Sequence, residues 1–134
     1  MNSTTTCETQ VRVRYAETDA MGIAHHTSYI VWFELGRVEL LRQTGHNYVD
    51  VERSGHYFAV SELNVRYLAP ARFDDLITIR TRISKMRSRT MTFEYELTLT
   101  DSGRLLVSGS TRHVCLDRDG NVATIPASIR HAFS

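Results

Sequence analysis

The stretch Tyr29–Arg42 reads YIVWFELGRVELLR, and it is the part of the sequence that decides the fold. Its apolar residues are too dense for one face of a strand, and they cover much of the circumference of a helix of about four turns. Such a helix is usually buried. Thr27 or Ser28 can cap its start, and Gly45 can close its end. The stretch therefore predicts one long central helix that the rest of the chain covers.

Strand patterns lie on both sides of this helix. Ahead of it, Val11, Val13 and Tyr15 alternate with arginines, which is the period of a half-buried strand. Four more strands are expected after the helix, at Phe58–Tyr67, Leu76–Ile83, Met91–Leu99 and Leu105–Leu116. Short turns such as Asp101–Gly103 join the later strands, so we expect these strands to be antiparallel.

Together these elements predict an α+β fold, in which an antiparallel sheet of about five strands wraps around one long central helix. We expect a single domain over residues 10–134, preceded by a flexible N-terminal segment at residues 1–9. A loop is expected around Asn47–Gly55, and Pro126 is expected to open a short closing helix.

Composition limits the classes of function that the chain can have. Hydrophobic residues make up 42% of the 134 residues, enough for a core, and a formal net charge of +1 gives no sign of nucleic-acid binding. No run approaches the roughly 18 apolar residues of a membrane span. The polar segment Met1–Gln10 does not resemble a signal peptide, so we expect a cytoplasmic protein. Cys7 is expected in the loose N-terminal segment and Cys115 as a buried free thiol.

The segment between the first strand and the helix reads YAETDAMGIAHHTSY, residues 15–29, and it gathers polar groups in front of a helix N-terminus. Such a terminus presents unpaired N–H groups and a partial positive charge, which can stabilise an oxyanion. The Asp19 carboxylate beside it can attack a carbonyl carbon or activate water. This combination suits acyl transfer, although Asp19 can equally be a residue that only caps backbone N–H groups.

The adjacent pair His25-His26 raises the question of a metal site. Neighbouring residues point in different directions, and the sequence has no second histidine pair at ligand spacing. We therefore expect no metal site.

The pattern Y-x-E-T-D-x-x-G-I-x-x-H-x-S-Y, followed by Phe33-Glu34 and Arg37, resembles the opening signature of the 4-hydroxybenzoyl-CoA thioesterase-like hotdog family. The segment YLAPARFDD, residues 67–75, resembles that family's next common segment. The resemblance spans about residues 10–120. It implies a hotdog fold and hydrolysis of an acyl-CoA thioester to free acid and CoA, with no cofactor beyond the CoA of the substrate.

The resemblance also implies roles for single residues. The family's catalytic carboxylate falls on Asp19, as nucleophile or as general base. The backbone N–H that polarises the carbonyl falls near His26, whose side-chain role stays open. Gly22 is expected to permit a tight backbone path that a Cβ might obstruct.

Three further residues complete the predicted oxyanion and substrate-binding set. Ile23 belongs to the motif itself, and Tyr29 is expected on the first turn of the helix, facing the pocket or the core. Many relatives carry an aromatic residue where this chain has His25, which changes the polarity of the pocket mouth. The sequence therefore does not decide whether the acyl group of the substrate is aromatic, short and branched, or of medium chain length.

Two more positions are candidates by resemblance. Arg87 and Arg89 lie in the turn KMRSRT, residues 85–90, and relatives often grip the CoA phosphates with basic residues there. The alternative for this turn is a solvated hairpin. Glu62, beside Ser61, matches a position where some hotdog enzymes receive a polar residue from a neighbouring subunit; the alternative is an outward pair on a strand.

Two rival functions are weighed. Hotdog hydratases typically have Asp and His five residues apart, but the residue five after Asp19 is Ala24. Hotdog acyl-CoA sensors usually carry a DNA-binding module, for which we expect no room in this chain.

We expect a homodimer or a dimer of dimers, because the sheet's second face needs cover and its edges need partners. The expected partner is an acyl-CoA, with no nucleic acid or membrane.

Overall fold

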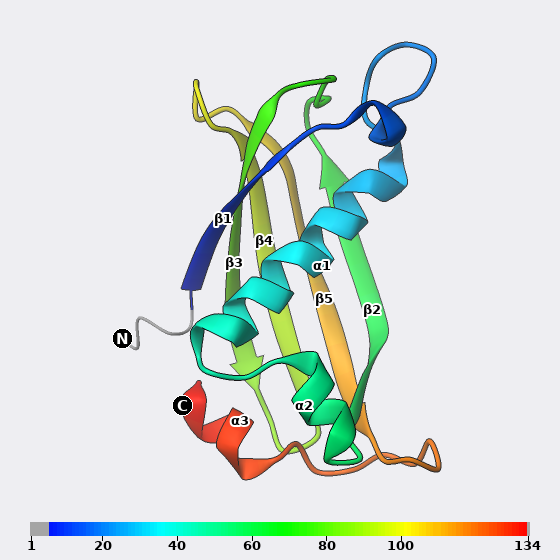
Figure 1. The fold of residues 1–134 in the computed structure, drawn as a ribbon, viewed down its shortest axis with the longest axis vertical. Helices are drawn as coiled ribbons and strands as arrows, with labels where there is room; N and C mark the ends of the chain where they lie inside the picture. The colour runs from blue at the N-terminus through cyan, green and yellow to red at the C-terminus, as the bar shows by residue number, and fades with distance from the viewer. Residues whose placement is uncertain (1–5, 134) are drawn as a thin grey trace.

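One sheet and one long helix dominate residues 6–133, the part of the chain that the computed structural model describes. The elements in chain order are β1 Thr6–Arg12, a short 3₁₀ helix Tyr15–Glu17, α1 His26–Gln43, α2 Tyr48–Arg53, β2 Tyr57–Tyr67, β3 Leu76–Met86, β4 Thr90–Leu99, β5 Leu105–Leu116 and α3 Ala127–Ala132. The five strands pair antiparallel in the order β1-β3-β4-β5-β2. Helix α1 crosses one face of this sheet (Figure 1). The predicted α+β architecture is confirmed.

Close packing holds α1 on the sheet. A Cβ added at Gly36 would lie 2.2 Å from Thr81 Oγ1, so only glycine allows the helix this near to β3. Three residues earlier, the Phe33 ring stacks on Tyr95 of β4, with ring centroids 4.2 Å apart. The helix is not buried all round, however, because Val31 on its outer side is 53% exposed.

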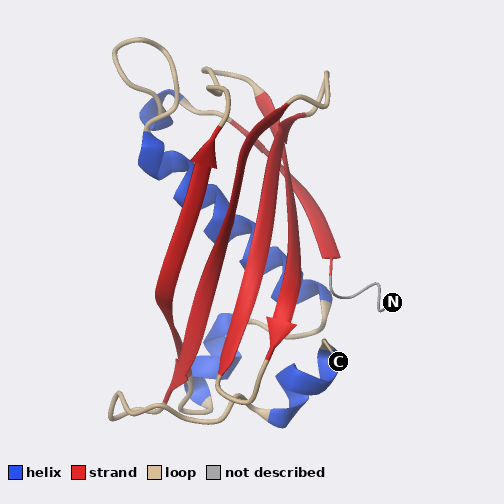
Figure 2. Ribbon diagram, turned by 180° about the vertical axis from the view of Figure 1, so that it is seen from behind, coloured by secondary structure: helices blue, strands red, loops and turns tan. Residues whose placement is uncertain are grey.

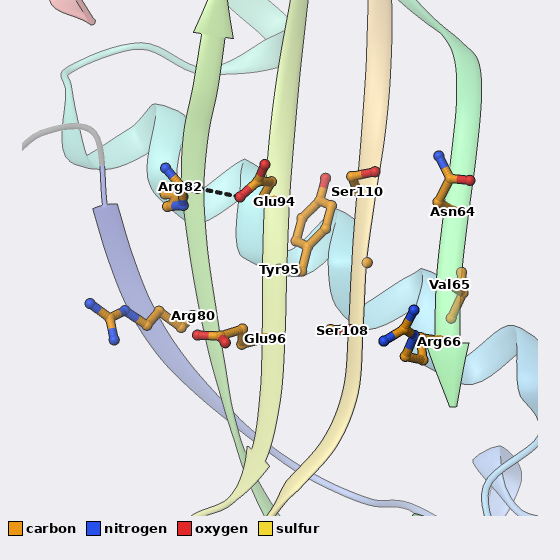
Figure 3. A pocket seen from close by; sticks show the side chains of 11 residues that line it. Asn64, Val65, Arg66, Arg80, Arg82, Glu94, Tyr95, Glu96, Ser108 and Ser110 are labelled. Carbon is orange, nitrogen blue, oxygen red and sulfur yellow. Dashed lines mark hydrogen bonds and ion pairs between the residues drawn. The ribbon is translucent and has the colours of Figure 1, made fainter. Parts of the chain in front are cut away.

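The second face of the sheet, turned toward the viewer in Figure 2 with α1 behind it, carries polar and charged side chains. Because side chains alternate along a strand, Ile77 and Ile79 face α1 while Arg80 and Arg82 point the other way. Arg82 forms an ion pair with Glu94 of β4 (Figure 3). Charged and polar side chains line a hollow of about 700 Å³ on this face. Polar side chains on this face are compatible with solvent, and the expectation that a second chain covers the face stays a prediction.

Several predicted boundaries were wrong. Strand β1 begins at Thr6 and pairs with β3, so residues 6–9 of the expected flexible segment belong to the sheet. Cys7 is accordingly buried, whereas a loose position was expected. The expected loop around Asn47–Gly55 contains α2, whose start is capped by the Asn47 side chain accepting from the Asp50 N–H.

The end of α1 follows its sequence signal, but its start does not. Gly45 has φ +88°, and its N–H donates to the Arg42 carbonyl while the His46 N–H donates to Leu41. This is the Schellman arrangement that a glycine after a helix permits. At the start, His25 takes the capping position and no side chain caps the helix, so the expected cap by Thr27 or Ser28 was wrong.

Candidate active site

The segment 18–25 closes into a small loop at one end of the sheet, directly ahead of α1 (Figure 1). The Asp19 N–H donates to the Ile23 carbonyl at 2.8 Å, and Thr18 forms a β-bridge with Ala24. The His25 N–H then donates to the Glu17 carbonyl at 2.8 Å. The loop therefore returns to its own starting point where the helix begins.

Asp19 uses one carboxylate oxygen to hold this loop. Its Oδ1 accepts from the Met21 N–H at 2.8 Å and from the Ile23 N–H at 3.4 Å. Its Oδ2 accepts no hydrogen bond from any residue in the range 6–133. The capping role that the sequence left open is thus present, and the second oxygen of this half-buried carboxylate remains available.

Gly22 is needed for its backbone conformation. Its φ is +79°, a left-handed value that side chains rarely adopt, and an added Cβ would meet nothing within 4 Å. The expected reason, obstruction by a Cβ, was therefore wrong.

The segment 67–75 clamps the loop from the other side. Ile23 forms a β-bridge with Arg72, and the Ala24 N–H donates to the Ala71 carbonyl at 2.9 Å. The two stretches that carry the family resemblance are thus bound to each other in space, which explains why they occur together.

The first amides of α1 have no capping side chain. The helix starts at His26, and neither His25 nor a neighbouring side chain accepts from its first N–H groups. The amides of His26 and Thr27 at this terminus are therefore suited to polarise a carbonyl oxygen. The His26 ring is exposed and lies 4.9 Å from the Tyr67 ring, while the Tyr67 hydroxyl donates to the His26 carbonyl at 2.9 Å.

Tyr29 faces the core. Its side chain is 2% exposed, and its hydroxyl accepts from the Ala71 N–H at 2.9 Å. Burial raises the pKa of this phenol. Of the two predicted orientations, pocket or core, Tyr29 therefore has the second. Its hydroxyl holds the segment 67–75 through Ala71.

Sequence reasoning missed Glu17. This carboxylate is 8% exposed and accepts from the Arg14 N–H at 2.8 Å and the Trp32 Nε1–H at 3.0 Å. Burial raises the pKa of Glu17, but the hydrogen bonds from Arg14 and Trp32 outweigh it and leave the pKa lowered. Glu17 stands inside the quoted motif, yet no local pattern shows that a glutamate in a polar segment is buried.

The turn between β3 and β4, which contains Arg87 and Arg89, lies at the opposite end of the sheet from the loop ahead of α1 (Figure 1). Strand β3, which separates the two ends, has 11 residues and spans roughly 35 Å. Around Arg87 lies a hollow of about 410 Å³, also lined by Arg130, His131, Met86 and Phe133. Arg89 does not line this hollow. Arg130 was not among the residues predicted from sequence patterns.

Glu62 also lies away from Asp19. It is exposed midway along the edge strand β2, where a bulge shifts the register between Val60 and Glu62. One chain therefore brings together Asp19, Gly22, Ile23 and the first residues of α1, but not Glu62, Arg87 or Arg89.

Residues 6–133 contain no cluster of three or more His, Cys, Asp or Glu side chains that could hold a metal ion. Within the same range, no helix has the length and apolar character needed to cross a membrane.

The sheet, the helix and the loop at its N-terminus define a known class of protein. The family model of the thioesterase-like superfamily matches residues 13–133, so the chain belongs to that superfamily. Its fold is the hotdog fold of the structural neighbours, as the resemblance implied.

Particular relatives agree with this assignment. The chain is 32% identical to the putative acyl-CoA thioesterase YneP of Bacillus subtilis, over 92% of this chain and 87% of YneP. It is 34% identical to the acyl-CoA thioester hydrolase YbgC of Escherichia coli, over 86% of this chain and 85% of YbgC. Among solved structures, the DHNA-CoA thioesterase of Staphylococcus aureus superimposes with a TM-score of 0.85 at 30% identity, covering 89% of this chain and 80% of that one.

Proposed function

We propose that the chain hydrolyses an acyl-CoA thioester to a free acid and CoA. The observation that carries this proposal is the pairing of an uncapped helix N-terminus with a loop whose carboxylate keeps one oxygen available. The names of YneP and YbgC support the same reaction class. CoA enters as part of the substrate, and the proposed chemistry uses no separate cofactor or metal.

In this proposal the thioester carbonyl oxygen binds at the amides of His26 and Thr27. Asp19 Oδ2 either attacks the carbonyl carbon or takes a proton from an attacking water. The negative charge that develops on the carbonyl oxygen is stabilised by the helix amides. Collapse of the intermediate breaks the C–S bond and releases the CoA thiolate. In the general-base route this gives the free acid directly, with its new oxygen from water and the abstracted proton left on Asp19 for the thiolate. In the nucleophilic route it gives a mixed anhydride on Asp19, which a water molecule then hydrolyses to the free acid and the Asp19 carboxylate.

We further propose that two chains share each site. If Asp19 and Arg87 contact one CoA ester, they belong to different chains, because one chain holds them at opposite ends of the sheet. Antiparallel pairing of two β2 edge strands about a two-fold axis would set the Asp19 end of one chain beside the Arg87 end of the other.

Strand β2 has features that suit this pairing. It is an edge strand, its residues are mostly exposed, and its exposed side chains include Val60, Leu63 and Tyr67. Unpaired N–H and C=O groups on a long edge favour a partner strand. In such a dimer Glu62 lies at the interface, in keeping with its predicted role at a shared site, and two dimers can assemble into a tetramer.

The test is Asp19→Asn assayed against a panel of aromatic, short branched and medium-chain acyl-CoAs, with detection of the free thiol. We expect the kcat of the best substrate to fall by about 100-fold or more, because one proton acceptor or nucleophile is lost. Asp101→Asn, in an exposed turn, is the matched control and is expected to keep full activity. Unchanged hydrolysis by Asp19→Asn would exclude the proposed role, and tight binding without turnover by the native chain would favour a binding protein.

A further inference from the structure

Glu17 joins three separate parts of the chain through its side chain and its main-chain carbonyl. Its carboxylate accepts from the Arg14 N–H, which follows β1, and from the Trp32 indole, which lies on the second turn of α1. Its main-chain carbonyl accepts from the His25 N–H at 2.8 Å and from the Ser28 hydroxyl at 2.9 Å. One residue therefore fixes the end of β1, the start of the loop and the first turns of the helix relative to one another.

These contacts bear directly on where Asp19 lies. Asp19 is two residues after Glu17, and the Thr18–Ala24 bridge stands between Glu17 and the rest of the loop. The Trp32 side chain that donates to the Glu17 carboxylate is 1% exposed and belongs to the core. The carboxylate thus ties the residue just before the loop to a buried side chain of the helix.

We propose that Glu17 is a positioning residue for the proposed thioester hydrolysis, holding the Asp19 carboxylate at a fixed place relative to the N-terminal amides of α1. It touches neither substrate nor reacting atoms, and the inference rests on the proposed function of Asp19. Attack on a carbonyl requires the carboxylate and the oxyanion donors in one geometry, and a displacement of about 1 Å can cost on the order of 100-fold in rate. Substrate affinity depends far less on that geometry.

The test compares Glu17→Gln and Glu17→Ala with Glu52→Gln, an exposed glutamate on α2 that serves as control. Glutamine keeps the shape and one acceptor oxygen, whereas alanine removes both. We expect kcat to fall about 10-fold in Glu17→Gln and further in Glu17→Ala, with KM within twofold of the native value. Hydrogen exchange in the peptide covering residues 18–25 should increase in both variants but not in the control.

A second variant separates positioning from general destabilisation. Trp32→Phe removes the indole donor together with part of a buried ring. The part of its kcat loss that acts through Glu17 should not add to that of Glu17→Gln in the double variant. If Glu17→Ala does not fold, Glu17→Gln and Trp32→Phe still carry the test.

Two outcomes overturn the proposal. One is a kcat for Glu17→Gln within twofold of native while Asp19→Asn is inactive, in which case only the positioning role fails. The other is a loss that merely follows the fraction of unfolded protein. Full activity of Asp19→Asn would instead reject the proposed function itself.

Discussion

The two ends of the sheet are built differently. At one end, main-chain hydrogen bonds from the 3₁₀ helix, from α1 and from the segment 67–75 hold the Asp19 loop in place. At the other end, the β3–β4 turn presents Arg87 beside Arg130 in an open hollow, and the Arg87 side chain has no ion pair or hydrogen bond with residues 6–133. The first end is held in one geometry by the chain itself, as the proposed hydrolysis requires, while the second presents arginines whose charge suits an anion.

Both ends are joined by the core of the sheet and helix. We expect the stability of this core to fall in acid. His113 is 1% exposed on β5, and burial together with the charge of Arg37 lowers its pKa from 6.5 to about 4. The unfolded chain therefore binds a proton below pH 6.5 that the folded chain does not, so stability falls as the pH drops from 6.5 toward 4. We expect about 2 kcal/mol less stability at pH 5 than at pH 7.5 by urea denaturation.

A matched variant identifies the group responsible. His113→Gln can keep a hydrogen bond to Thr111 and carries no titrating ring, so its stability should be nearly equal at the two pH values. Glu17 has a lowered pKa, so its contribution to stability is lost only as the pH falls below the ordinary glutamate value of 4.5. That range lies below the interval from pH 5 to pH 7.5 over which stability is compared. An unchanged pH dependence in His113→Gln would move the effect to another group.

The arginines at the second end of the sheet should affect substrate binding rather than the chemical step. In the double variant Arg87→Ala/Arg130→Ala we expect KM for an acyl-CoA to rise roughly 10-fold with kcat nearly unchanged, because charge-assisted bonds to the CoA phosphates are lost. An acyl-pantetheine, which lacks the nucleotide, should be hydrolysed equally by native and variant chains. A fall in kcat on both substrates would contradict the assignment of this end to binding.

The smallest effect concerns backbone strain in the Asp19 loop. Gly22→Ala and Gly103→Ala both place a Cβ at a positive φ, +79° and +74°, with nothing within 4 Å. Each should cost about 1 kcal/mol of stability in thermal or urea unfolding. Only Gly22→Ala should also lower kcat, because Gly103 lies in a distant turn. Equal activity of the two variants would show that loop geometry near Asp19 is not critical.

Sequence patterns predicted the parts of the fold that depend on local order. Strand β5 has the predicted bounds Leu105–Leu116, and the dense apolar stretch from Tyr29 does form the long helix. The start of β1 was missed because residues 6–10 are mostly polar, and only pairing with β3 makes them a strand. Such pairing is a tertiary effect that no local pattern reveals.

For the candidate site too, local patterns predicted the residues of one contiguous segment but not those that depend on tertiary contacts. Asp19 and Gly22 stand in a contiguous motif, so resemblance found them, although Asp19 also proved to cap its own loop. Glu17 and Arg130 were missed for a different reason. The partner of Glu17 is Trp32 on the helix, and Arg130 meets Arg87 only when α3 packs near the β3–β4 turn.

The most direct test of the account mixes two inactive or weakened chains. Asp19→Asn and Arg87→Ala/Arg130→Ala are unfolded together, refolded and assayed at a low concentration of acyl-CoA. If each site takes Asp19 from one chain and the arginines from its partner, a mixed dimer contains one intact site. We predict that the mixture regains activity above the sum of the separate variants, approaching one quarter of the native value as expected for random pairing. A mixture no more active than that sum would contradict the shared site and return the chemistry to a single chain.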